Sequence, residues 1–233
     1  MIFWGKESWK DKLLNKLFFT DPTVTDISQM PMLMFSLQRI YKATKDKKLL
    51  EEFLPRLIEY HEWWKTRRQP DGDGKIVIIH PWESGLDASP MYDEALKVKN
   101  PKPKLKELYP KFEELQLNYR FKYNWKTNKI ISKKTTAANP RFLDYFVIKE
   151  VGVNAVYTAG WKVHKELALE IGNFKLADYC DKQYNHFLKG LLSFYDPETK
   201  RYTSEYLDVD RFRRTRANTV QGLFPILITD LPQ

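Results

Sequence analysis

Two pairs of adjacent helical segments are the strongest constraint on how this 233-residue chain can fold. In each pair one segment is apolar nearly all round, as expected of a helix enclosed by other helices, and the next has one apolar stripe and one charged face. The first pair spans about residues 30–43 and 48–68, and the second about 149–171 and 173–192. We therefore predict an all-α fold in which 30–43 and 149–171 are inner helices and the other two are outer helices.

The C-terminal part of the chain continues this pattern. A third helical pair is predicted to begin near Phe212, because apolar residues recur after it at helical spacing: Val220, Leu223, Phe224, Leu227 and Ile228. The loops between the pairs differ greatly in length and no fixed repeat is visible, which argues against an open solenoid and favours a ring of hairpins. Long, unequal loops at one end of such a scaffold are where binding and catalysis usually occur.

Basic residues are concentrated in one segment. The formal net charge is +9, and residues 97–134 account for all of it with twelve Lys or Arg against three Glu. Aromatic residues interleave with these charges, as they do on some proteins that bind single-stranded nucleic acid: Tyr109, Tyr119, Phe121, Tyr123 and Trp125. A lysine-rich, solvated excursion between helices gives the same pattern. We expect the excursion, projecting from the fold and contributing little to its core, and keep nucleic-acid binding as the alternative.

Several classes of protein are disfavoured by what the sequence does not contain. There is no run of about 18 apolar residues and no secretory signal at the start, so we expect a cytoplasmic protein that does not bind membranes. The single cysteine, Cys180, excludes an intrachain disulfide and lies on an apolar stripe, where we expect an inert core residue. His61, His164 and His186 lack metal-ligand spacing, so we expect neither a metal nor a cofactor.

Residues 71–75 read DGDGK, which we interpret as a tight turn. A calcium loop of the EF-hand type would need a Glu at its twelfth position, and the sequence has none there.

The segment 80–90, HPWESGLDASP, combines an aromatic ring, Trp82, with two carboxylates, Glu83 and Asp87. Glycoside cleavage needs a carboxylic acid that stays protonated, a second carboxylate that activates water or attacks the sugar, and aromatic faces that hold the ring. The segment supplies an acid and an aromatic. By composition alone, a capped structural loop is the favoured interpretation.

The same eleven residues resemble the signature of the six-hairpin glycosidases of glycoside hydrolase family 63, above all the mannosylglycerate and glucosylglycerate hydrolases, and trehalases have a related version. Residues 29–31, 151–155 and 219–225 resemble the starts of inner helices in that family. The resemblance implies an incomplete (α/α)6 barrel over 1–233, one domain with the basic excursion at about 97–134. It also implies inverting hydrolysis of short α-linked glucosides or mannosides, such as glucosylglycerate or mannosylglycerate. Asp87 takes the place of the general acid.

The resemblance also suggests which side chains bind the sugar. We expect Gln29, Trp82, Glu83 and Asn154 to bind substrate around Asp87, with Glu83 bracing the loop or holding a hydroxyl rather than acting as base. Ala88 departs from the polar residue that is common after the acid, which bears on a hydrogen bond near it.

The family's general base would follow the end of this sequence, so we expect a fragment or a reduced relative of the barrel, with an exposed apolar flank and negligible hydrolysis by itself. Glu205 is a substitute candidate for the base. In an extended protein, Asp87→Asn is expected to cut turnover by at least about 10²–10⁴. A non-catalytic helical module that binds sugar or nucleic acid is the alternative function. The sequence pattern specifies no oligomeric state.

Overall fold

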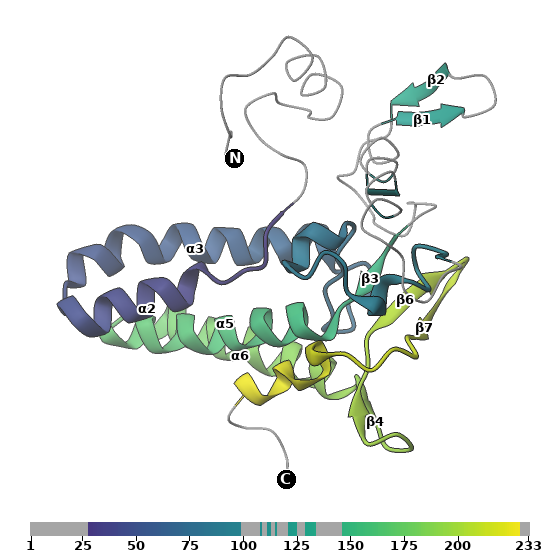
Figure 1. Ribbon diagram of the computed structural model, residues 1–233. Helices are drawn as coiled ribbons and strands as arrows, with labels where there is room; N and C mark the ends of the chain where they lie inside the picture. Colours follow the sequence, from purple (N-terminus) through teal and green to yellow (C-terminus); the bar gives the residue numbers. More distant parts are fainter. Residues whose placement is uncertain are drawn as a thin grey trace.

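The computed structural model describes residues 28–98 and 146–228, together with Leu108, Lys111, Phe112, Leu115 and the backbones of strands β1 (Phe121–Asn124) and β2 (Lys129–Lys133) (Figure 1). Its α-helices are α2 (Leu33–Thr44), α3 (Lys47–Arg68), α5 (Val151–Glu170) and α6 (Phe174–Leu192). Three 3-10 helices accompany them: η1 (Pro81–Ser84), η2 (Pro90–Tyr92) and η4 (Val220–Leu227). The two hairpins α2–α3 and α5–α6 lie side by side, as predicted (Figure 1).

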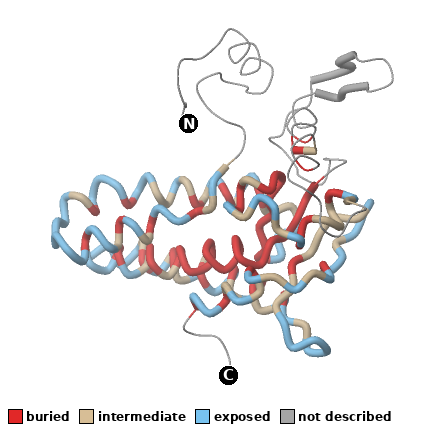
Figure 2. The backbone as a smooth tube through the Cα atoms, viewed as in Figure 1, coloured by how far each residue is buried: buried red, intermediate tan, exposed pale blue. Residues whose placement is uncertain are grey.

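Helix α5 is the centre of the fold. Fifteen of its 20 residues are buried, and it contacts α2, α3, α6 and η4 (Figure 2). Helix α6 covers it with a single apolar stripe that includes Cys180, Tyr184 and Phe187. The prediction of an enclosed inner helix followed by an amphipathic outer one is therefore confirmed for this pair.

Helix α2 differs from the prediction, because it is not enclosed. Met34, Leu37 and Tyr41 are buried against α3 and α5, whereas Leu33 and Ile40 are 59% and 49% exposed. A helix that is apolar all round needs neighbours on every side, and the described elements cover only one face of α2.

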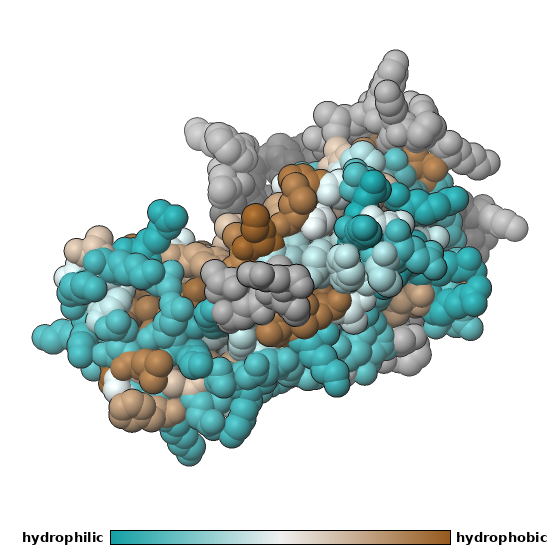
Figure 3. Space-filling view, turned by 90° about the horizontal axis from the view of Figure 1, so that it is seen from below, coloured by the Kyte–Doolittle hydropathy of each residue, from teal (hydrophilic) through white to brown (hydrophobic). Residues whose placement is uncertain are grey.

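Helix η4 also presents an apolar face, on which Leu223 and Ile226 are 68% and 82% exposed. Apolar patches interrupt the hydrophilic surface in the view from below (Figure 3). The expected exposed apolar flank is thus present within the described residues.

Short antiparallel strands, which the sequence pattern does not predict, join the helical hairpins. Strand β6 (Glu205–Asp208) pairs with both β3 (Ile148–Lys149) and β7 (Arg211–Arg214), and β4 (Tyr195–Asp196) pairs with β5 (Arg201–Tyr202). The predicted start of a third helical pair near Phe212 is wrong, because this residue lies in β7 opposite Leu207. The helical spacing of apolar residues corresponds to a helix only from Val220 onward, where η4 begins.

The basic segment 97–134 lies mostly outside the described residues, and so do its interleaved aromatic side chains. The expectation that it contributes little to the core is wrong for three of its residues. Leu108, Phe112 and Leu115 are buried in the main hydrophobic cluster with Trp64 and Tyr92. An apolar residue at every third or fourth position lets a charged segment bury one face while its lysines remain outside.

Candidate active site

The stretch that precedes the 80–90 segment, Ile76 to Ile79, is fully buried. Residues from elsewhere in the fold form hydrogen bonds with its backbone groups. The Asn154 side chain accepts from Ile76 N and donates to Ile76 O, each at 2.8 Å. Ile78 and Ile148, the first residue of β3, donate to each other's carbonyl groups. Because buried backbone groups must be paired, these contacts determine where the following loop emerges.

Glu83, within the 80–90 segment, also helps to hold this buried stretch in place. Its side chain has no exposed surface; Oε1 accepts from Arg68 Nη2 at 3.0 Å and from Ser28 N at 2.9 Å, and Oε2 accepts from Ile79 N at 2.7 Å. Three charge-assisted hydrogen bonds satisfy a carboxylate that would otherwise be costly to bury. Glu83 therefore braces the loop against the end of α3, which is one of the two roles expected of it from the sequence.

The loop itself bends twice to present Asp87. Pro81 and the His80 ring, whose Nδ1 accepts from Trp82 N at 3.1 Å, start the short helix η1. Gly85 ends η1 with a φ of 70°, a conformation that favours glycine. A turn follows in which Ser89 N donates to the carbonyl of Leu86 at 3.0 Å, and Asp87 is its second residue.

Asp87 lies at the rim of an open depression of about 480 Å³. One wall is the 80–90 segment, here called the acid loop, and the other is the segment that leads into η4. The lining residues are Leu86, Asp87, Ala88, Ser89, Pro90, Asn218, Thr219, Val220 and Gln221. Although Asp87 is an exposed residue, partial burial raises the pKa of its carboxyl, against a hydrogen bond from its own backbone that lowers it. Among the described residues that line the depression, Asp87 carries the one carboxyl group.

Residues 218–221 are the part of this site that was not predicted from the sequence. The only signal was the resemblance of 219–225 to the start of an inner helix. That resemblance placed the segment in the ring but specified no side chain at the site. Gln221 is buried, and its Nε2 donates to Ser89 Oγ at 2.8 Å, so the two walls are joined directly.

The other sugar-binding candidates lie away from the lining of this depression. Asn154 and Glu83 are buried and bound to backbone groups, as described above. Gln29 is exposed, and its carbonyl accepts from the Tyr60 hydroxyl at 2.7 Å. The half-buried Trp82 ring packs against His80 and Phe112, with centroids 4.6 and 6.0 Å away. Neither Gln29 nor Trp82 therefore lines the depression beside Asp87.

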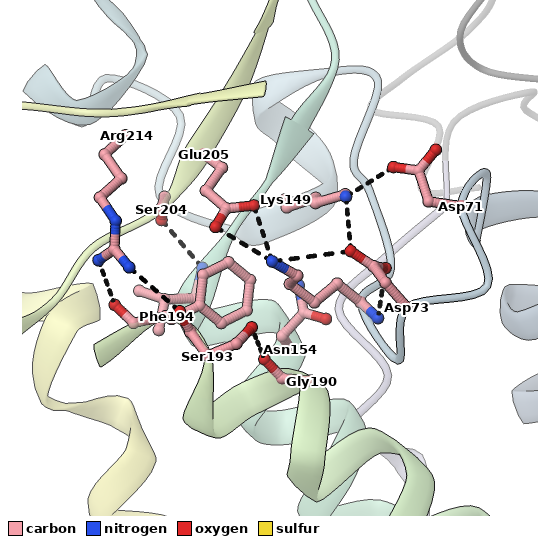
Figure 4. Close-up of polar contacts among 12 residues, drawn as sticks. Asp71, Asp73, Lys149, Asn154, Gly190, Ser193, Phe194, Ser204, Glu205 and Arg214 are labelled. Atoms are coloured by element: carbon pink, nitrogen blue, oxygen red, sulfur yellow. Dashed lines mark hydrogen bonds and ion pairs between the residues drawn. The ribbon is translucent and has the colours of Figure 1, made fainter. Parts of the chain in front are cut away.

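Glu205 belongs to an ion-pair network (Figure 4). It does not line the depression. Lys75 Nζ binds both of its carboxylate oxygens, at 3.0 and 2.9 Å, while Lys149 Nζ binds Asp71 at 2.7 Å and Asp73 at 2.8 Å. The network ties the 71–75 turn, in which Gly72 and Gly74 have positive φ, to β3 and β6. A carboxylate held by a buried lysine is poorly suited to serve as the base, so the geometry does not favour Glu205 in that role.

A second buried carboxyl, Glu150, caps the start of α5. It accepts from the backbone N–H groups of Gly152 and Val153, and burial raises its pKa to about 7 although these two donors lower it. Glu150 has no exposed surface, so water and substrate do not reach it.

Neither a metal centre nor a membrane span is found in the part of the chain that the structure describes. No cluster of three or more His, Cys, Asp or Glu side chains there is arranged to hold a metal ion. No helix in the same residues combines the length and apolarity that crossing a bilayer requires.

Comparison with known families gives a match over almost the whole chain. The family model described as the mannosylglycerate hydrolase MGH1-like glycoside hydrolase domain matches residues 2–233. Mannosylglycerate hydrolase MGH1 of Selaginella moellendorffii is 41% identical over 76 residues, which are 31% of this chain and 16% of that protein. The mannosylglycerate hydrolase of Thermus thermophilus is 31% identical over 97 residues, 40% of this chain and 21% of that protein.

Solved structures show the same fold. The GH63 mannosylglycerate hydrolase from Thermus thermophilus in complex with Tris and D-glycerate superposes with a TM-score of 0.72 at 23% identity, covering 95% of this chain and 55% of that one. The complex of that hydrolase with glucose gives a TM-score of 0.65 at 22% identity, covering 87% and 48%. The chain thus spans about half the length of these structures, and its hairpins form part of a helical barrel.

Proposed function

Because the chain belongs to the mannosylglycerate hydrolase MGH1-like glycoside hydrolase family, we propose that it contributes the general acid, Asp87, to inverting hydrolysis of a small α-glycoside. The observation that carries the proposal is the placement of Asp87 on a braced turn at the rim of an open depression, where burial raises the pKa of its carboxyl. A raised pKa favours the protonated form that a general acid needs.

The chemistry follows from that carboxyl. The Asp87 proton goes to the glycosidic oxygen while the bond from this oxygen to the anomeric carbon breaks. Water attacks the same carbon from the opposite face, and a second carboxylate takes its proton across a gap of roughly 6.5–9.5 Å. Asp87 is the one carboxyl lining the depression among the described residues, so the proposal assigns water activation to a group outside them.

The proposed substrates are glucosides or mannosides of a small acid, such as glucosylglycerate or mannosylglycerate. The support is the names of the relatives, which include a glucosylglycerate hydrolase of Mycolicibacterium hassiacum, 29% identical over 102 residues. We assign to Gln29 and Trp82, which are exposed and half-buried and do not line the depression, contacts with the part of the substrate that extends beyond it. Glu83 and Asn154 position the loop.

A rescue experiment tests the acid without requiring a base. Azide is a nucleophile that needs no deprotonation, so it replaces activated water and yields a glycosyl azide of inverted configuration. We expect the chain to release glycerate from mannosylglycerate or glucosylglycerate when azide is present and to release almost none without it.

Asp87→Asn should abolish this rescue, because glycerate is a poor leaving group unless it is protonated. Asp93→Asn is the matched control, since Asp93 follows in the same loop but does not line the depression. Equal rescue in the wild-type chain and in Asp87→Asn would refute the assignment.

A further inference from the structure

The turn that carries Asp87 is anchored at both ends by serine side chains. At its start, Ser84 Oγ accepts from Leu86 N at 3.0 Å and donates to Pro81 O at 2.7 Å. At its end, Ser89 accepts from Met91 N and starts η2. These contacts determine the shape of the turn but not its position relative to the opposite wall of the depression.

Gln221 provides the connection across the depression. Its side chain is 1% exposed, and Nε2 donates to Ser89 Oγ at 2.8 Å. Among the described residues that line the depression, this is the one side-chain hydrogen bond that links the acid loop to the 218–221 wall. The two residues are 132 positions apart in sequence, so the bond specifies how two distant segments meet.

The helix that carries Gln221 is itself firmly placed. A Cβ on Gly222 would lie 2.8 Å from the carbonyl oxygen of Tyr202, and a Cβ on Gly152 would lie 2.8 Å from the Phe224 ring. Such approaches are possible only because both residues are glycines. Helix η4 thus packs directly on β5 and α5, and Gln221 extends from the part of it that these contacts hold.

We infer that Gln221 is a positioning residue for the proposed acid: by holding Ser89, it fixes the turn that carries Asp87 against the wall formed by residues 218–221. The inference rests on the proposed function of Asp87. A glycosidic oxygen bound in the depression then meets the carboxyl in one orientation, which proton transfer requires. Without this bond Asp87 remains present, but the turn loses its direct link to the 218–221 wall, and only the exposed contacts of Arg216 with Glu94, beyond the turn, still join the two segments among the described residues.

Gln221→Leu tests this, because leucine nearly fills the same space and cannot form the hydrogen bond. The first readout is the titration of the Asp87 carboxyl, followed by NMR in the unliganded chain. A looser turn exposes the carboxyl to water, so its pKa should fall toward the ordinary aspartate value of about 3.9. The second readout is azide-rescued cleavage, whose maximal rate should fall by up to about a hundredfold while KM changes little.

Gln69→Leu is the matched control, since Gln69 Nε2 bonds His186 Nε2 at 2.8 Å and Gln69 does not line the depression; both readouts should stay at wild-type values. Ser89→Ala removes the same bond from the loop side together with the cap on Met91 N, so its effect should be at least as large as that of Gln221→Leu, and the double variant should lose little more than Ser89→Ala. Ser89→Ala also carries the test if Gln221→Leu does not fold.

A wild-type Asp87 titration together with a wild-type rescued rate in Gln221→Leu would overturn the inference. If Asp87→Asn abolishes rescue in the same assay, the proposed acid survives that result. If Asp87→Asn retains rescue, the proposed function fails, and the NMR titration still decides whether Gln221 positions the turn.

Discussion

Replacing Glu83 by Gln should destabilise the protein strongly, because this one carboxylate holds together α3, the buried 76–79 stretch and the acid loop. The substitution keeps the shape of the side chain and removes its charge. Arg68, which is 2% exposed, is then left as a buried cation without its anionic partner. The new amide NH₂ also faces a backbone N–H, either that of Ser28 or that of Ile79.

The magnitude follows from the burial of both partners. Breaking a buried ion pair by removing one member costs about 3–5 kcal/mol, a large share of the roughly 5–15 kcal/mol that stabilises a typical domain. For a chain of this size, that loss lowers the melting temperature by about 6–20 °C. Urea and thermal unfolding, followed by circular dichroism, measure it.

Glu52→Gln provides the matched control. It removes the same charge from a pair with Arg56 whose side chains are 59% and 69% exposed, at 3.9 Å. An exposed pair of this kind contributes about 0–1 kcal/mol. If Glu83→Gln cost no more than Glu52→Gln, the bracing role of Glu83 would be wrong, and the loop would have to be held by other contacts.

Three further predictions concern the core. Burial lowers the pKa of His61 to about 3 and that of His164 well below 6.5. Below about pH 6.5 the unfolded chain therefore binds more protons than the folded chain does. Denaturant titrations should show the free energy of unfolding falling from about pH 6.5 toward pH 3, by up to about 1.4 kcal/mol per pH unit for each ring. Burial raises the pKa of Cys180 to about 12, so a disulfide reagent at neutral pH should label it only as fast as the chain unfolds. Gly160→Ala should destabilise by about 1–3 kcal/mol despite the better helix propensity of alanine, because the new methyl would lie 2.5 Å from His61 Nε2; unchanged urea unfolding would contradict this.

The resemblance of residues 80–90 predicted the family correctly, and the all-round apolar pattern of residues 149–171 predicted the enclosed helix α5. A helix that is buried on all sides must be apolar on all sides, and this can be read without knowing its neighbours. The all-round apolar pattern of α2 looked the same, but burial depends on which elements lie beside a helix, and the described chain covers only one face of α2.

The strands were not predicted because they are short, and because the pairing of β3 with β6 joins residues that lie far apart in the sequence. Strand β3 has two residues, and β7 is rich in arginine, so neither shows an alternating pattern. The sequence pattern therefore predicts a helix from near Phe212, whereas η4 begins only at Val220. In the hairpin of residues 205–214, the turn is the one local feature of the sequence that indicates strand pairing.

The sequence alone could not show whether Glu83, Asn154 and Gln221 bind a ligand or a buried group of the protein itself. Each is a polar residue beside an apolar stretch, and such a residue can face either a ligand or a buried backbone group. Their partners, Arg68, Ile76 and Ser89, lie 15, 78 and 132 positions away, so only the folded chain shows which alternative holds.

The most direct measurement of the central claim compares two leaving groups in the azide-rescued reaction of the wild-type chain and of Asp87→Asn. Glycerate needs a proton to depart, whereas dinitrophenolate does not. If Asp87 is the general acid, Asp87→Asn should lose at least about 10²–10⁴ in rate on mannosylglycerate or glucosylglycerate and almost none on the corresponding dinitrophenyl glycoside. Equal losses on both substrates, or no loss on either, would contradict the role of Asp87 as the proton donor.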